Sequence, residues 1–199
     1  IGRTGRLTCM ANRCHREVRG ALRIDGERTL ELDIANCQPL LLYTLYTSHC
    51  EESQRWKLLA ETGKVYELFM DELGIDRDSV KKLMFPFLYS TIGAEPTLEA
   101  VMEKHFPKLL KLINAEKAKH YKALCYGMQR KEAKVIVGLM ANHTKIPAIT
   151  VHDAVYVKFA DAYEAEKLIR EEFQKRYGVT PLITREIPPS IEELTALAA

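Results

Sequence analysis

Hydrophobic and polar positions alternate along this chain with two different periods. Residues 22–34 form two extended runs around a turn at Asp25-Gly26, and the second run alternates apolar with acidic side chains, which is the period of a strand. Residues 148–157 alternate in the same way and predict a β-hairpin with its turn at residues 152–154. A further strand is predicted over residues 181–187.

The middle of the chain has apolar residues at every third or fourth position, which predicts helices. One helical stretch covers residues 51–73 and is broken at Thr62-Gly63. The next helix has Asp76 or Asp78 as its N-cap and is interrupted by Pro86, which has no backbone N–H.

Residues 98–140 are expected to hold two or three helices, with breaks near Pro107 and Gly127. After the hairpin, residues 161–164 have the pattern of a capping box, and they open a helix that ends at Gly178. A last short helix is capped by residues 190–193. Strands, then helices, then strands and a helix predict an α+β fold, an antiparallel sheet with a helical insertion.

Composition narrows the class of protein. The chain has 199 residues, of which 47% are hydrophobic and 28% charged, and this excludes a disordered tail, a collagen-like repeat and a coiled coil. No apolar stretch approaches the roughly 20 residues that span a bilayer, so no membrane partner is expected. Five cysteines without a CxxC pair favour a reduced, intracellular setting. A zinc site at Cys9, Cys14 and His15 is disfavoured because paired ligand spacing is missing.

Positive charge is concentrated at the start of the chain. The net charge of the whole chain is only +2, but residues 1–28 hold seven arginines against three acidic residues. An arginine-rich arm suits a polyanionic partner such as nucleic acid. A solvated surface explains the same charges equally well.

Two aspartates are candidates for metal chemistry. Asp33 ends one predicted strand and Asp153 lies at the tip of the later hairpin. If these strands pair, the carboxylates lie roughly 5 Å apart and repel unless cations lie between them. Two divalent ions of the kind used in phosphoryl transfer fit this arrangement. Taken alone, an aspartate at a strand end is more often a turn former or a cap.

A second candidate is a series of side chains spaced four apart: Arg77, Lys81, Phe85 and Tyr89. On a helix this spacing places two cations and two aromatic rings in one stripe. The cationic end suits triphosphate oxygens and the aromatic end suits a base. The alternative is that the rings belong to the core and the cations are solvated.

The stripe resembles the fingers helix of family A (polymerase I-like) DNA polymerases. Four other segments resemble motifs of that family in the same order: Arg3-Thr-Gly-Arg-Leu7, Leu32 to Pro39, Met128-Gln129 and Thr150-Val-His-Asp-Ala154. The match extends from Gly2 to about Ile187. It implies a palm at residues 1–48 and 128–199, fingers at 49–127 and no thumb.

The resemblance also implies roles for individual residues. The implied ligands of two Mg²⁺ ions are Asp33, Asp153 and the Ile34 carbonyl. The implied nucleotide contacts are Arg77 and Lys81 at the phosphates, with Lys81 also catalytic, Phe85 at the sugar and base, Tyr89 near the templating base and Gln38 under the sugar. The implied primer–template contacts in the minor groove are Arg6, Gln129 and His152.

Several positions depart from the family pattern. Gln38 stands where the family usually has Glu, which weakens the expected discrimination against ribonucleotides. Ala154 replaces a carboxylate, and residues 64–67 hold no counterpart of a family histidine. Pro86 removes a helix hydrogen bond at a cost of about 3 kcal/mol and is expected to kink the helix before Tyr89.

The resemblance implies a DNA-directed DNA polymerase of bacterial or phage origin, acting in the cytoplasm on primer–template and deoxynucleoside triphosphates. A chain of 199 residues is expected to be the palm and fingers only, with a thumb supplied by another domain or chain. Three alternatives remain: a single-subunit RNA polymerase or primase-like enzyme, a non-catalytic nucleic-acid-binding remnant, and a metal phosphohydrolase.

Overall fold

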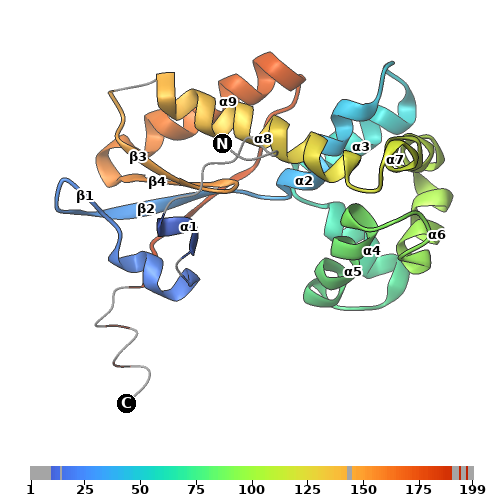
Figure 1. The fold of residues 1–199 in the computed structure, drawn as a ribbon, viewed down its shortest axis with the longest axis horizontal. Helices are drawn as coiled ribbons and strands as arrows, with labels where there is room; N and C mark the ends of the chain where they lie inside the picture. Colours follow the sequence, from blue (N-terminus) through green and yellow to red (C-terminus); the bar gives the residue numbers. More distant parts are fainter. Residues whose placement is uncertain (1–9, 14, 143–144, 190–192, 194–195, 197–199) are drawn as a thin grey trace. The chain divides into compact units, whose positions relative to one another are not determined.

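The computed structural model describes residues 10–13, 15–142, 145–189, 193 and 196 (Figure 1). They divide into two units. One unit comprises the residues up to Ala35 together with those from Arg130 onward, and the other comprises Asn36–Gln129. The first unit contains a β-sheet, and the second is helical.

The sheet of the first unit is antiparallel and has β2 at its centre. Among the described residues it contains β1 (Arg23–Ile24), β2 (Glu27–Ile34), β3 (Ala148–Val151), β4 (Ala154–Lys158) and β5 (Ile183–Glu186). Strand β4 pairs with one edge of β2, and β1 and β5 pair with the other edge. Strand β3 pairs with the edge of β4 that faces away from β2. The predicted antiparallel sheet of an α+β fold is therefore confirmed.

Local turn chemistry explains the first hairpin. Asp25 and Gly26 both have positive φ angles, 51° and 82°, which is the conformation of a type I′ turn. Asp-Gly is a preferred pair for this turn because glycine carries no Cβ and aspartate tolerates the left-handed region. The predicted turn at Asp25-Gly26 is confirmed.

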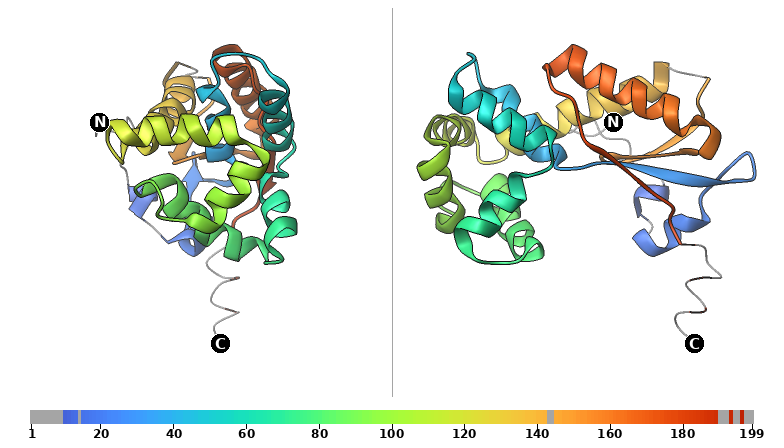
Figure 2. Two further views of the ribbon diagram at one scale, coloured as in Figure 1. Left: turned by 90° about the vertical axis from the view of Figure 1, so that its right-hand side faces the viewer. Right: turned by 180° about the vertical axis from the view of Figure 1, so that it is seen from behind.

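Different helices pack on the two faces of the sheet. Helix α9 (Ala162–Tyr177) and the part of α8 (Ala123–Asn142) from Arg130 lie over one face, and the short helices α1 (Met10–Arg13) and η1 (Arg16–Ala21) lie over the other (Figures 1 and 2). Leu32 faces α9 together with Val155, its partner across the ladder, and both are fully buried.

Helix α9 begins differently from the prediction. The helix runs to Tyr177 and ends at Gly178 with a positive φ of 67°, as predicted. However, Asp161 does not cap it, because its backbone is helical (φ −92°, ψ −8°) rather than extended and it ends a 3₁₀ turn, η3 (Phe159–Asp161). The predicted cap at residues 190–193 falls outside the described residues except for Glu193.

The second unit is built from short helices. In chain order they are α2 (Cys37–Leu42), η2 (Tyr43–Leu45), α3 (Glu51–Glu61), α4 (Val65–Leu73), α5 (Arg77–Tyr89), α6 (Pro96–His105), α7 (Pro107–Lys119) and the first part of α8. Trp56 and Phe106 pack edge to face in its core, with ring centroids 4.9 Å apart. The Trp56 indole N–H donates to the Pro39 carbonyl at 2.9 Å, so the buried N–H is satisfied.

Two predicted helix breaks are wrong. Helix α8 passes through Gly127 without interruption, because a glycine costs a helix only about 1 kcal/mol and keeps its hydrogen bonds. The chain turns instead at His120, whose backbone is extended. Helix α5 continues past Pro86 to Tyr89, because Phe87 and Leu88 are buried and hold the last turn against the lost hydrogen bond. The predicted break at Pro107 is confirmed.

None of the helices in the described part of the chain is both long and apolar enough to cross a membrane.

Candidate active site

Asp33 and Asp153 meet at one end of the sheet. In the β2–β4 ladder Asp33 is directly opposite Ala154, and Asp153 is the residue before Ala154. Opposed Cα atoms lie within about 5.5 Å and consecutive Cα atoms 3.8 Å apart, so the two aspartate Cα atoms are no more than about 9 Å apart. Both side chains are partly exposed. The structure thus places two aspartates that are far apart in the sequence at the same end of the sheet.

The turn that carries Asp153 holds a strained backbone. Val151 pairs with Ala154, so His152 and Asp153 form a two-residue turn. His152 has a positive φ of 56° and Asp153 does not, which is the pattern of a type II′ turn, where glycine is usual at the first position. A side chain in this region costs of order 1–3 kcal/mol, and such positions cluster at functional sites.

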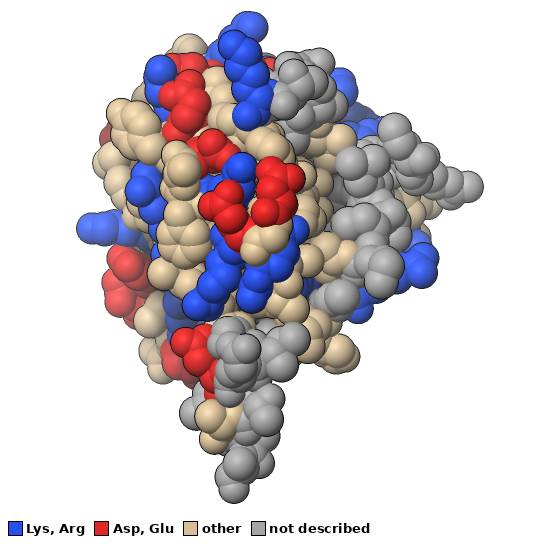
Figure 3. Space-filling model, turned by 90° about the vertical axis from the view of Figure 1, so that its left-hand side faces the viewer, with Lys and Arg blue, Asp and Glu red and all other residues tan. Residues whose placement is uncertain are grey.

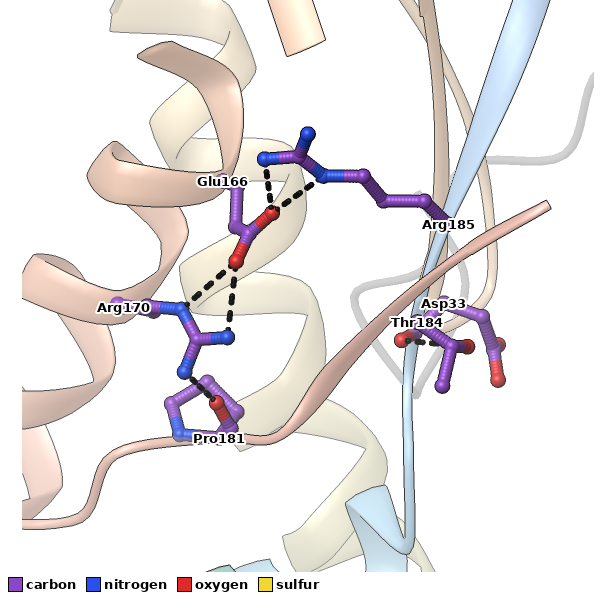
Figure 4. Close-up of polar contacts among 6 residues, drawn as sticks. All are labelled: Asp33, Glu166, Arg170, Pro181, Thr184 and Arg185. Carbon is purple, nitrogen blue, oxygen red and sulfur yellow. Dashed lines mark hydrogen bonds and ion pairs between the residues drawn. The ribbon is translucent and has the colours of Figure 1, made fainter. Parts of the chain in front are cut away.

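Asp33 lies on the face of the sheet opposite α9. Its neighbours across the ladders are Ala154 on β4 and Thr184 on β5, and the Thr184 hydroxyl donates to the Asp33 carbonyl oxygen at 3.5 Å. Figure 4 shows the Asp33 carboxylate on the side of the strands away from Glu166 of α9. Alternation in the sequence predicts the face of Asp33, but only the β2–β5 register reveals Thr184 beside it.

Strand β5 is held to α9 by a carboxylate between two guanidinium groups (Figure 4). Glu166 accepts hydrogen bonds from Arg170 at 2.8 and 3.1 Å and from Arg185 at 2.8 Å, and Arg170 also donates to the Pro181 carbonyl at 2.5 Å. Burial raises the pKa of Glu166, but the hydrogen bonds from both arginines outweigh it and lower the pKa overall. This network fixes the strand that pairs with Asp33.

A buried polar row lies next to Asp33 on the same face. Glu31 and its β4 partner Tyr156 are both buried, although the alternation in the sequence places Glu31 on a solvated face. Burial raises the pKa of Tyr156 to about 12, so the phenol stays protonated. The apolar neighbours of Ala154 on this face are Ala11, Val151 and Tyr156.

The donor set at this end of the sheet fits Mg²⁺. Mg²⁺ takes one or two carboxylates and completes its octahedral shell with water and substrate phosphates. Asp33, Asp153 and the Ile34 carbonyl offer only oxygen ligands of this kind. Within the described ranges, no group of three or more His, Cys, Asp or Glu side chains is placed to hold a metal, so tighter cages are not found there. Cys9 and Cys14 lie outside the described residues.

Helix α5 presents the cation–aromatic stripe. Phe85 is 66% exposed, so it is not a core residue, and its ring meets Tyr89 edge to face at 4.9 Å. Lys81 is exposed, and the Arg77 guanidinium lies 4.9 Å from the centroid of the Tyr66 ring. Neither cation forms an ion pair with a carboxylate that the structure describes. The cationic groups are therefore available to an anionic ligand.

The N-terminus of α5 is well capped. The Asp76 carboxylate accepts hydrogen bonds from the backbone N–H groups of Asp78 and Ser79 at 2.9 and 3.0 Å and from the Ser79 hydroxyl at 2.7 Å. These bonds, led by the one from the Ser79 hydroxyl, lower the pKa of Asp76. The cap fixes the first turn, where Arg77 begins the stripe, and confirms Asp76 as the cap.

The remaining predicted contacts are spread over other elements. Gln38 lies in the first turn of α2 and Gln129 in α8, both partly exposed, while His152 is exposed at the β3–β4 turn. Arg6 lies outside the described residues. Gln38 and Gln129 belong to the same unit as α5, and His152 to the unit that holds both aspartates.

The arginine-rich start of the chain forms no single-sign patch where it is described. Arg23 donates to the Gly20 and Leu22 carbonyls at 2.7 and 3.0 Å, and Arg28 lies 3.7 Å from Glu193. Lys158 pairs with Asp25 at 3.3 Å. Figure 3 accordingly shows basic and acidic side chains interleaved on this side of the molecule.

Comparisons with known proteins bear on the fold. No family model matches the chain, and no curated protein matches it. Among solved structures, it is similar to the POL domain of Pol1 from M. smegmatis in complex with DNA primer-template and dNTP, with a TM-score of 0.58 and 14% sequence identity. The fold is polymerase-like. The similarity covers 87% of this chain but 42% of that one, so the chain spans less than half of that structure. In this polymerase-like fold the antiparallel sheet is the palm-like part, and it carries both aspartates.

Proposed function

We propose that this chain is the palm and fingers of a family A-type DNA polymerase, which adds deoxynucleotides to a primer 3′-hydroxyl on a template. The observation that carries the proposal is the register of β2 and β4, which sets Asp33 opposite Ala154, the residue after Asp153, so that both aspartates lie at the same end of the sheet. A two-carboxylate pair at adjoining strand ends, within a polymerase-like fold, suits two-metal phosphoryl transfer better than any other chemistry considered above.

The palm-like sheet would bind the metal ions. Asp33, Asp153 and the Ile34 carbonyl would hold two Mg²⁺ ions, which neutralise charge on the phosphates and activate the primer hydroxyl. The strained φ of His152 lies in the turn that carries Asp153 and would help to orient it toward the metal ions. His152 itself would contact the primer–template end, together with Gln129 and Arg6.

Helix α5 would bind the incoming nucleotide. Arg77 and Lys81 are cations without ion-pair partners among the described carboxylates, so they would hold the phosphates at little cost in broken contacts. Phe85 already exposes its ring and would pack on the sugar and base, with Tyr89 near the templating base. Gln38 would lie under the sugar, where a 2′-hydroxyl would project.

One observation favours a second candidate, a nucleic-acid-binding protein without catalysis. Ala154 stands beside Asp153 and packs against Ala11 and Tyr156, so the palm-like face lacks a third carboxylate there. Such a protein would bind primer–template duplex and would not extend it.

Primer extension by the full chain tests the proposal. Asp33→Asn and Asp153→Asn are each expected to lose extension by about a thousandfold or more in Mg²⁺, because either change removes a metal ligand. Asp25→Asn is the matched control, since Asp25 also lies in a hairpin turn of the same sheet, and it is expected to stay within about twofold of wild type.

The outcomes separate the candidates. Extension by either asparagine variant at the wild-type rate would refute the metal site. Duplex binding without extension by the wild type would favour the non-catalytic protein. Incorporation of ribonucleotides as readily as deoxyribonucleotides would favour an RNA polymerase or primase, and Gln38→Glu would then be expected to restore discrimination.

A further inference from the structure

Lys117 is a lysine that the nucleotide chemistry above does not use. It lies in α7 and is only 4% exposed. Its ammonium group donates to the Phe87 carbonyl oxygen of α5 and lies 5.3 Å from the centroid of the Phe87 ring. Lysine is almost never fully buried unless it is paired, so this contact needs an explanation.

The Lys117 ammonium is paired with a backbone carbonyl near the end of α5 and not with a carboxylate. Within the described residues its ammonium forms no ion pair, and Glu99, whose charge acts on it, accepts a hydrogen bond from the Gly93 N–H at 2.8 Å instead. Burial lowers the pKa of Lys117, and the charge of Glu99 opposes that shift. The cation is thus held by a carbonyl and an aromatic face.

The end of α5 is the part of that helix that most needs support. The last carbonyls of a helix have no partner inside it and carry the negative end of its dipole. Pro86 removes one further hydrogen bond because it has no N–H. The last turn keeps the bond from the Ser90 N–H to the Pro86 carbonyl at 3.0 Å, and Lys117 supplies a second attachment at Phe87.

The aromatic half of the stripe begins one residue before Pro86 and ends in this turn. Phe85 and Tyr89 lie on either side of Phe87 in the sequence, and their rings touch edge to face. We propose that Lys117 is a positioning residue for nucleotide binding, which holds the last turn of α5 so that Phe85 and Tyr89 are oriented for the base. The inference rests on the proposed function, because it takes the ligand of Phe85 and Tyr89 to be a nucleotide base.

Two measurements on the full chain test the proposal. Lys117→Met keeps the length and apolar stem of the side chain and removes the cation. We expect the KM for dNTP to rise about tenfold while kcat stays within about twofold, because binding geometry and not chemistry is disturbed. Hydrogen exchange of residues 87–91 should accelerate about tenfold, with the first turns of α5 unchanged.

Two further variants serve as controls. Lys119→Met removes an exposed lysine from the same helix and is expected to match wild type in both measurements. Lys117→Arg keeps a cationic donor and is expected to recover most of the KM. Trp56, the one tryptophan of the chain, is buried in this unit and reports by fluorescence whether each variant is folded. If Lys117→Met is unfolded, Lys117→Gln replaces it under the same criteria.

The result that overturns the proposal is specific. A folded Lys117→Met with wild-type KM or wild-type exchange at residues 87–91 rules out positioning by Lys117, as does a failure of Lys117→Arg to recover KM. If the wild type extends primers, such a result leaves the proposed function intact. A wild type that extends no primer overturns the proposed function and, with it, the nucleotide role of Lys117.

Discussion

Phe85, which we propose to bind the nucleotide, and Phe87, a core residue, allow a direct test of the proposed site. They are two positions apart on α5, yet Phe85 is 66% exposed and Phe87 only 1%. Truncation of a buried phenylalanine costs about 3–5 kcal/mol, which is expected for Phe87→Ala. Phe85→Ala removes about a third of that burial and one edge contact with Tyr89, so we expect a loss of about 1 kcal/mol.

In nucleotide binding the order of the two variants should be reversed, so that Phe85→Ala, the less destabilised variant, shows the larger loss of affinity for dNTP. A stacked aromatic ring contributes about 1–3 kcal/mol per base, so Phe85→Ala should raise the KM for dNTP by roughly 5- to 150-fold. Denaturant unfolding, monitored by Trp56 fluorescence, gives the stability of the helical unit Asn36–Gln129. Steady-state primer extension gives the KM for dNTP. Leu58→Ala is the control, because Leu58 is 62% exposed on α3 and lies outside the stripe.

The reasoning fails on either of two results. If Phe85→Ala destabilises this unit as much as Phe87→Ala, Phe85 is a packing residue in solution. If Phe85→Ala is stable and its KM equals that of Leu58→Ala, the exposed ring has no part in nucleotide binding.

Two further predictions concern the palm-like unit. Glu166→Ala should cost about 1 kcal/mol, since its ion pairs with Arg170 and Arg185 are partly exposed, and circular dichroism melts should show it. Folding lowers the pKa of Glu166, so the stability that the wild type has over Glu166→Ala should be complete above the unfolded pKa of 4.5 and should vanish as the pH falls through the folded pKa. A stability difference that persists at low pH would contradict this. His152→Gly should relieve the positive φ and raise stability by about 1 kcal/mol while extension weakens, and an unchanged melt would argue against strain.

Features with local causes were predictable from the sequence. The turn at Asp25-Gly26 follows from the conformations that these two residues tolerate, and the end of α9 at Gly178 follows in the same way. The hairpin that carries Asp153 was visible as a change of period. Each of these depends on a few neighbouring residues and on no distant contact.

Features with distant causes were not predictable. Glu31 alternates like a solvated position, but it is buried beside Tyr156. Lys117 and Lys119 lie in the last turn of α7, where lysines are usually exposed, and only the placement of α5 explains the burial of Lys117. The continuation of α5 past Pro86 has the same kind of cause, since the packing of the residues after Pro86 decides whether the helix continues.

Ala154 constrains how the proposed metal site would work. The polymerase family that the sequence resembles has a carboxylate at this position, but the Ala154 side chain is buried against Ala11, Val151 and Tyr156, where a charge would be costly to hold. Two aspartates and one carbonyl leave most positions of two octahedral shells to water and to phosphate oxygens. Under the proposed function, the nucleotide is therefore itself a main ligand of the metal.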